Sequence, residues 1–175
     1  MNFISKQLTK NIDTASHAGF CYGVKRAVET TKKIKKENPG KEVFILGELI
    51  HNSSVIKELE ESGIKTVDKL PHPAPKNAIC IIRSHGEAID TIEKIKASGY
   101  EVVDLTCLDV KKVQDMAVNL VLEEYFLLIL GKEEHPEVMA IKSNAKKYSK
   151  DSNSPLVIKS LEDLISKSDL IKNKK

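Results

Sequence analysis

Residues 18–27 read AGFCYGVKRA, with a cysteine between two glycines at the point where polar sequence gives way to a helical pattern. Residues 104–112 read DLTCLDVKK, so both stretches contain Cys-x-x-Val-Lys followed by Arg or Lys. The two cysteines, Cys21 and Cys107, lie 86 positions apart (from 21 to 107). A pattern that returns after a long fixed spacing is typical of a duplicated structural unit.

A second motif returns with nearly the same spacing. It consists of an apolar run, a glycine and a histidine four residues after that glycine. The two copies are 43–46 followed by 47–51 (GELIH), and 126–130 followed by 131–135 (GKEEH). The histidines lie 84 positions apart (from 51 to 135). Two motifs that share one spacing predict two copies of a unit, each with one cysteine and one histidine at strand ends.

The spacing also predicts how the chain divides into lobes. We expect a first α/β lobe over residues 11–105 and a second, incomplete lobe over residues 106–170. A third copy would carry its cysteine at about position 193, beyond the residues of this chain. The sequence therefore predicts two of an expected three lobes, with the third absent from this chain.

Strand and helix patterns alternate throughout. Continuous apolar runs are typical of strands buried on both faces of a parallel sheet, and the amphipathic stretches between them predict helices. This alternation predicts an α/β fold of repeated lobes, with mostly parallel sheets and flanking helices. The expected strands are 11–18, 43–46, 64–67, 78–83, 101–105, 125–130 and 155–158, and the expected helices are 23–37, one ending at 61 and capped by Ser53 or Ser54, 87–97, 110–124, 137–144 and 161–165.

Five reactive side chains share one position in this pattern, the junction between a strand and the following helix. In open parallel sheets, ligands bind outside the carboxyl ends of the strands. A helix N-terminus favours a thiolate, which suits metal ligation or nucleophilic attack, and an imidazole there can bind an anion. The five residues are Cys21, His51, His85, Cys107 and His135.

Other reactive residues have simpler interpretations. Cys80 lies between isoleucines of an expected buried strand and is read as a core residue. His17 and His72 lie in polar or proline-rich sequence and are read as surface residues. Glu137 follows His135 by two positions, where it either stabilises the first turn of its helix or transfers a proton.

Composition excludes several classes of protein. With 41% hydrophobic and 30% charged residues, the chain has the make-up of a soluble globular protein. The net charge of +3 comes without clusters of basic and aromatic residues, so we expect no nucleic-acid partner. No apolar run approaches the ~20 residues of a membrane span, and no secretory signal is visible. We therefore expect no membrane partner and a cytoplasmic location in which the three cysteines stay reduced.

The spacing of the cysteines separates the kinds of metal or nucleophile site. Structural zinc sites usually contain closely spaced cysteine pairs, which are missing here. A Cys–His nucleophile pair would leave the second cysteine motif unexplained, and neither a dinucleotide fingerprint nor a P-loop is present. An iron–sulfur cluster accepts thiolates from distant points of a chain. Because two motif cysteines are too few for a cubane, this interpretation again points to a third unit.

Residues 18–27 resemble the first cysteine motif of the 4-hydroxy-3-methylbut-2-enyl diphosphate reductase family. Members of that family catalyse the last step of the non-mevalonate isoprenoid pathway. Further stretches resemble the later motifs of the family in the same order. These are 49–52 (LIHN), 82–86 (IRSHG), 104–107 (DLTC) and 135–138 (HPEV). The matches extend over nearly the whole chain.

The resemblance implies a three-lobed α/β fold around a central [4Fe-4S] cluster, with one cysteine ligand from each lobe. Cys21 and Cys107 would be two of these ligands. His51 and His85 would bind the diphosphate of the substrate through charge-assisted hydrogen bonds. His135 would contact the substrate near its hydroxyl and its diphosphate.

The resemblance also implies a reaction. Glu137 would deliver the proton that lets the substrate hydroxyl leave as water. Two electrons would pass through the cluster from ferredoxin, flavodoxin or a reduced nicotinamide system, and the allylic diphosphate would be converted into isopentenyl and dimethylallyl diphosphate. In such enzymes the cofactor carries the redox chemistry, and the protein supplies geometry and protons.

The chain departs from the family pattern in three ways. The third lobe, with its cysteine and its Ser, Thr and Asn diphosphate ligands, has no counterpart here. Leu108 and Asp109 stand where the family usually has proline and then an aromatic or aliphatic residue. A carboxylate beside the cluster makes reduction harder, because reduction adds negative charge. Glu134 replaces the usual glycine before the HPEV motif.

Three hypotheses follow. In the first, the chain is a fragment of an active enzyme whose cluster is completed by other residues, and the isolated chain is inactive. In the second, it is a non-catalytic two-lobe protein that binds a diphosphate or a partner through His51, His85 and His135. In the third, Cys21 and Cys107 of two chains bind a metal at an interface between them.

Overall fold

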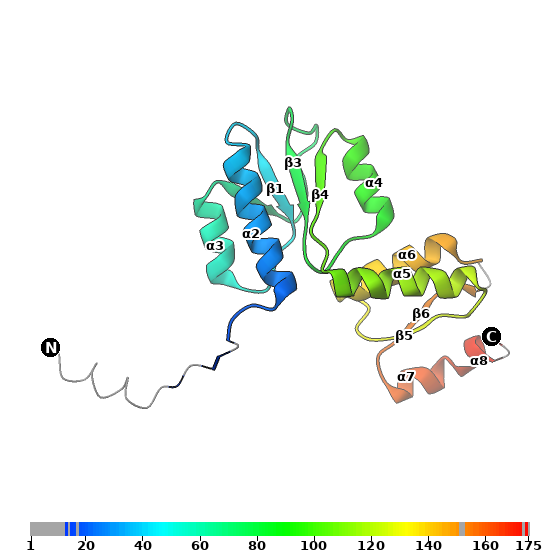
Figure 1. Ribbon diagram of the computed structural model, residues 1–175. Helices are drawn as coiled ribbons and strands as arrows, with labels where there is room; N and C mark the ends of the chain where they lie inside the picture. The colour runs from blue at the N-terminus through cyan, green and yellow to red at the C-terminus, as the bar shows by residue number, and fades with distance from the viewer. Residues whose placement is uncertain (1–12, 14, 17, 151–152, 173, 175) are drawn as a thin grey trace.

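The computed structural model describes residues 13, 15–16, 18–150, 153–172 and 174. Its helices and strands alternate along the chain (Figure 1). The helices are α2 (Tyr22–Glu37), α3 (Ser53–Glu61), α4 (Ile89–Ala97), α5 (Leu108–Leu122), α6 (Pro136–Tyr148), α7 (Leu161–Ser166) and α8 (Ser168–Ile171), and the strands are β1 (Val43–Leu46), β2 (Ile64–Val67), β3 (Ile79–Ile82), β4 (Glu101–Asp104), β5 (Leu128–Leu130) and β6 (Leu156–Ile158).

The strands form two parallel sheets. The first has four strands in the order β2-β1-β3-β4, and the second pairs β5 with β6. In the first sheet Val43 lies opposite both Ile64 and Ile79. The predicted α/β class, with parallel sheets and flanking helices, is therefore confirmed. The lobe boundaries 11–105 and 106–170 stay a prediction.

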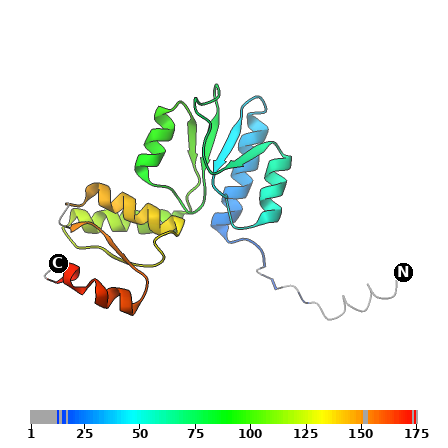
Figure 2. The same ribbon diagram turned by 180° about the vertical axis from the view of Figure 1, so that it is seen from behind.

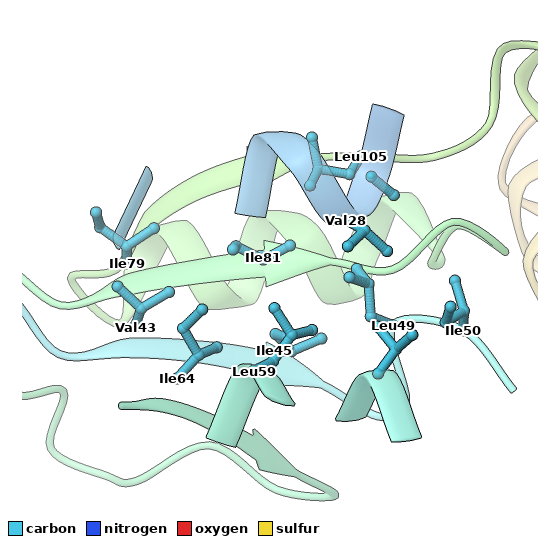
Figure 3. Close-up of a cluster of buried hydrophobic side chains, with 12 residues drawn as sticks. Val28, Val43, Ile45, Leu49, Ile50, Leu59, Ile64, Ile79, Ile81 and Leu105 are labelled. Carbon is cyan, nitrogen blue, oxygen red and sulfur yellow. The ribbon is translucent and has the colours of Figure 1, made fainter. Parts of the chain in front are cut away.

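The two central strands of the four-stranded sheet, β1 and β3, are buried on both faces, as their continuous apolar runs predict. Side chains alternate between faces along each strand. Val43, Ile45, Ile79 and Ile81 pack with residues of α2 and α3 on one face, as Figure 3 shows. Phe44, Cys80 and Ile82 pack on the other face with Ile95 of α4 and with Tyr100. Helices thus cover both faces of the strands. The carboxyl ends of the strands lie along one edge of the sheet.

An equivalent backbone hydrogen bond occurs within each of the two predicted repeats. The amide of Gly47 donates to Val67 O at 2.8 Å, and the amide of Gly131 donates to Ile158 O at 2.9 Å. Each bond joins the residue after one strand to the last residue of its parallel neighbour. The same order of helix, strand, helix and strand therefore closes in the same way in both repeats.

The second repeat lies beside the carboxyl edge of the first sheet (Figure 2). Its helices α5 and α6 lie side by side through Ala117, Val121 and Ala145, which are buried. Its two-stranded sheet is less well covered, since Leu130 is 76% exposed. Within the described ranges, no helix combines the length and the apolar character that crossing a membrane requires.

The structure corrects the local predictions at three places. The cap of α3 is Asn52, whose side-chain oxygen accepts from the amide of Val55 at 3.1 Å, and not Ser53 or Ser54. The described residues of the range 11–18 contain no strand. The short helix α8 follows α7 directly and was missed, because four residues are too few to show a helical period.

We predict that replacing Ile81 by alanine lowers the free energy of unfolding by about 3 kcal/mol, within the ~2–5 kcal/mol typical of a buried Ile→Ala change. Ile81 is 0% exposed in the central strand β3, so the truncation leaves a cavity in a core held on both sides. Urea denaturation followed by circular dichroism measures the change.

Leu130→Ala is the matched control, because it truncates a strand residue that is 76% exposed. We expect it to change the free energy of unfolding by less than about 0.5 kcal/mol. Equal losses for the two variants would contradict the assignment of the core to the first sheet.

Candidate functional site

Ser84, in the turn after β3, holds three segments of the chain together. It is 6% exposed, and its hydroxyl donates to Leu49 O at 3.0 Å. Its carbonyl accepts from the amide of Cys107 at 2.9 Å. The loop that carries His51, the turn that carries His85 and the second cysteine motif therefore meet at one buried residue.

Three imidazoles gather around this turn. The ring centroids of His51 and His85 lie 4.8 Å apart with an interplanar angle of 30°. Those of His85 and His135 lie 6.1 Å apart at 78°. The structure thus brings together the three histidines that the sequence predicted for one site, although they come from two different repeats.

The imidazoles have different hydrogen-bond partners. His51 Nδ1 lies 3.1 Å from Glu48 Oε2. His135 caps α6, and its Nδ1 accepts from the backbone amide of Glu137 at 3.3 Å, so the neutral ring carries its proton on Nε2. Nδ1 of His85 is buried and has no hydrogen-bond partner among the described residues. Two rings are therefore oriented by the protein, and the middle one keeps its hydrogen-bonding capacity.

The pKa of His85 lies below the ordinary value for histidine. Burial is the largest cause, because it disfavours the charged ring, and His51 adds to the shift. Glu137 opposes the shift, while Arg83 and His135 reinforce it. The neutral form of His85 therefore predominates at pH 7. An anion bound beside the ring would offset the positive charge of Arg83 and so favour protonation of His85.

The two motif cysteines occupy equivalent positions at facing helix ends. Cys21 is the N-cap of α2 and Cys107 is the N-cap of α5. A Cβ atom added to Gly23 would lie 2.7 Å from Cys107 Sγ, so the second sulfur lies against the first turn of α2. Arg26 Nη2 donates to Thr106 O at 2.6 Å and fixes this approach. The sulfurs are thus on neighbouring turns and not in separate cores.

Asp109 does not act as an isolated carboxylate beside these thiols. The Tyr22 hydroxyl donates to its Oδ2 at 2.6 Å, and Lys112 Nζ lies 3.2 Å from its Oδ1. The hydrogen bond from Tyr22, and then that from Lys112, lower the pKa of Asp109. The pKa of Tyr22 is raised, chiefly by the hydrogen bond to Asp109, followed by burial and the bond to Cys107. A charged carboxylate and a neutral phenol therefore face each other at neutral pH.

Cys80 differs from the motif cysteines in every respect. It is 0% exposed, and burial raises the pKa of its thiol to about 12. It packs between Phe44 and Ile82, as its position in an apolar run predicts. Two thiols therefore lie outside the core, those of Cys21 and Cys107.

A buried carboxamide pair, which sequence reasoning missed, ties α6 to the His85 turn. Asn144 Oδ1 accepts from the amide of Ile89 at 2.8 Å, and Asn144 Nδ2 donates to Gln114 Oε1 at 3.4 Å. Gln114 Nε2 would lie 2.5 Å from a Cβ atom on Gly86, whose φ is +79°. Only glycine suits that conformation and that space. A polar residue on the inner face of an amphipathic helix is the signal that could have found this pair.

The donor set is compatible with part of a metal cluster. Among the described residues, no group of three or more His, Cys, Asp or Glu side chains is arranged to hold a metal ion. Two thiols at facing helix N-termini nevertheless match the demand of iron–sulfur clusters for thiolate ligands from distant points of a chain. Cys21 and Cys107 thus fit two ligand positions, and further ligands have to come from outside this set.

The model of the family described as LytB protein matches residues 12–172. Among curated relatives, 4-hydroxy-3-methylbut-2-enyl diphosphate reductase of Clostridium tetani is 40% identical over 75% of this chain and 21% of its own length. The enzymes of the same name from Alkaliphilus oremlandii and Citrifermentans bemidjiense are 39% and 42% identical, over 73% and 75% of this chain and 45% of each relative. The chain therefore spans less than half the length of these relatives.

Two solved structures share the fold. The structure of (E)-4-hydroxy-3-methyl-but-2-enyl diphosphate reductase, the terminal enzyme of the non-mevalonate pathway, superimposes with a TM-score of 0.74 and 32% identity. It matches 87% of this chain and 52% of its own. The Plasmodium falciparum reductase gives a TM-score of 0.75 at 25% identity, over 86% of this chain and 45% of that one.

We predict that His85 makes stability fall on acidification. Its pKa is lowered in the folded state, whereas the unfolded side chain titrates near about 6.5. Below that pH the unfolded chain binds more protons, so the contribution of His85 is complete above pH ~6.5 and is lost as the pH falls through the folded pKa. Urea denaturation of wild type and His85→Gln between pH 7.5 and 5 should show a shallower pH dependence in the variant.

His72→Gln is the matched control, because His72 is exposed and lies outside the imidazole cluster. It should keep the pH dependence of the wild type. Parallel curves for wild type and His85→Gln would contradict the role of burial at this ring.

Proposed function

The chain belongs to the LytB protein family, and on that premise we propose that its residues form part of the site of a 4-hydroxy-3-methylbut-2-enyl diphosphate reductase. In that reaction the C–O bond of the allylic hydroxyl breaks. Two electrons and two protons enter, water leaves, and isopentenyl or dimethylallyl diphosphate forms. The proposal covers the oxidoreductase activity, the diphosphate substrate and the metal ligands.

One observation carries the proposal. The backbone bond from Cys107 to Ser84 joins the second thiol to the turn of His85, while Gly23 brings the first cysteine motif against Cys107 Sγ. A thiol pair and an imidazole cluster therefore adjoin at the carboxyl edge of one parallel sheet, where α/β proteins bind ligands. Reduction of a diphosphate substrate at a thiolate-bound cluster would use both kinds of group in one place.

In this proposal His51, His85 and His135 bind the diphosphate. Imidazole N–H groups donate to phosphate oxygens, and an approaching anion favours protonation of His85. Charge-assisted bonds from several imidazoles would hold the diphosphate at the strand ends. The allylic end of the substrate would then extend toward Cys107.

Glu137 is proposed to deliver the proton to the leaving hydroxyl. It lies in the first turn of α6, two residues after His135, whose Nδ1 accepts from the backbone amide of Glu137 at 3.3 Å. A proton donor has to lie within hydrogen-bonding reach of the atom it serves, and the imidazoles would orient the substrate so that this holds. The donated proton accompanies the departing oxygen as water.

Cys21 and Cys107 are proposed to ligate a [4Fe-4S] cluster. When bound, such a cluster supplies electrons and a Lewis-acidic iron for removal of the hydroxyl. Because the chain presents two thiols for this role, a further ligand would come from residues outside it. A cytoplasmic setting with ferredoxin, flavodoxin or a reduced nicotinamide system as donor would keep the thiols reduced and supply the electrons.

A second function is favoured by one feature of the site. All three imidazoles lie within the chain, whereas the thiol set of a cubane does not. A non-catalytic protein that binds diphosphate through His51, His85 and His135 would need nothing more than these residues. Diphosphate binding that persists without a cluster is common to both functions, so iron binding has to distinguish them.

We predict that the chain binds inorganic diphosphate and that His51→Ala, His85→Ala and His135→Ala each weaken binding roughly tenfold, the effect of one charge-assisted hydrogen bond. Isothermal titration calorimetry measures the dissociation constant. His72→Ala is the matched control and should bind as the wild type does. Unchanged affinity in all three variants would refute the diphosphate site.

We predict that anaerobic incubation with iron and sulfide loads the chain through Cys21 and Cys107. Cys21→Ser and Cys107→Ser should lose bound iron, whereas Cys80→Ala should retain it because that thiol is buried. Iron and acid-labile sulfide per chain are the measurements. We expect that the isolated chain does not oxidise reduced viologen when substrate is present. Iron binding that is unchanged in both serine variants would favour the non-catalytic function.

A further inference from the structure

A side-chain hydrogen bond joins the two cysteine motifs directly. The Tyr22 hydroxyl donates to Asp109 Oδ2 at 2.6 Å, between residues 87 positions apart. Tyr22 follows Cys21, and Asp109 lies two residues after Cys107. A bond so close to both sulfurs limits how far the two helix N-termini can separate.

Both partners of this bond are held in place. The second carboxylate oxygen of Asp109 faces Lys112 Nζ at 3.2 Å, which fixes the rotation of the carboxylate. The hydroxyl of Tyr22 reaches Asp109 in the first turn of α5, so the ring extends from the start of α2 to the second motif. The bond therefore spans the facing ends of α2 and α5 instead of reaching a distant loop.

The bond lies at the surface, which limits what it does for the whole fold. Tyr22 is 54% exposed, and the side chain of Asp109 is 62% exposed. Water competes for exposed polar groups, so such contacts add little to global stability. Deeper contacts, such as Arg26 to Thr106 O, already pack the two motifs together. What the surface bond can still control is the local geometry of the thiols.

We propose that Tyr22 and Asp109 are a positioning pair that latches the N-terminus of α2 to that of α5 and sets the separation of the Cys21 and Cys107 thiolates for one shared metal centre. The inference rests on the proposed ligand role of the two cysteines. It also gives Asp109 a function at a position where an aliphatic or aromatic residue could not accept the Tyr22 bond.

Cadmium ion is the probe for this latch, because a soft cation selects thiolates and reports them by charge-transfer absorption without sulfide or reductant. The whole chain is titrated anaerobically as wild type, Tyr22→Phe, Asp109→Asn and the double variant. Each single variant should bind Cd²⁺ roughly three- to tenfold more weakly, the range expected for the net contribution of one ordinary hydrogen bond at an exposed position. The double variant should bind no more weakly than Tyr22→Phe, because that variant already lacks the donor of the bond, whereas Asp109→Asn keeps a weaker, neutral acceptor.

Matched controls make the same chemical changes elsewhere. Tyr148→Phe alters an exposed tyrosine at the end of α6, and Asp115→Asn removes a carboxylate on α5 that pairs with Lys111 instead of Tyr22. Both should bind Cd²⁺ as the wild type does. Urea midpoints of Tyr22→Phe and Asp109→Asn should match the wild type, which separates a local effect on the thiols from general destabilisation.

The outcomes separate the latch from the thiol site. Cys21→Ser and Cys107→Ser should abolish tight Cd²⁺ binding. If they do and the latch variants still bind like wild type, the latch is wrong and the thiol site stands. If Cd²⁺ binding is the same in both serine variants as in the wild type, the proposed thiol site is wrong, and the latch is wrong with it. Weaker binding accompanied by an equal loss of stability would also overturn the positioning role.

Discussion

The buried hydrogen bonds of Ser84 connect three of the segments that form the candidate site. Its hydroxyl bonds to the loop that carries His51, and its carbonyl bonds to the amide of Cys107. Burial makes these bonds costly to leave unmade, so the three segments cannot drift apart independently. The position of Ser84 follows in turn from β3, whose side chains pack on both faces of the sheet. The packing of β3 in the core thus determines where the three segments of the site lie.

Duplication explains why one edge of the molecule collects so many reactive groups. Each repeat ends a strand with a glycine whose amide closes onto the neighbouring strand, and each starts a helix at a cysteine. Packing the second repeat against the carboxyl edge of the first sheet brings the N-terminal ends of α2 and α5, which begin at the two motif cysteines, close to each other (Figure 1). Duplication also accounts for two of the imidazoles, because His51 and His135 occupy the same place in the two copies.

Periodicity predicted the fold well, because strands buried on both faces read as unbroken apolar runs and helices as amphipathic stretches. It could not select Asn52 over Ser53 as a cap, because both side chains offer an oxygen and only the extended backbone at Asn52 decides. The gathering of the histidines followed from parallel strand order. Ser84, Gln114 and the Tyr22–Asp109 bond did not, since pairings between distant residues leave no periodic signal in one sequence.

The burial of Cys80 makes it a built-in probe of the fold. Its thiol is sealed between the sheet and α4 and stays protonated at neutral pH, so an alkylating reagent can reach it only when the core opens. Labelling of the motif cysteines reports the surface, whereas labelling of Cys80 reports the opening of the domain. One mass spectrum of a briefly alkylated sample therefore reads out both the accessibility of the candidate site and the integrity of the scaffold beneath it.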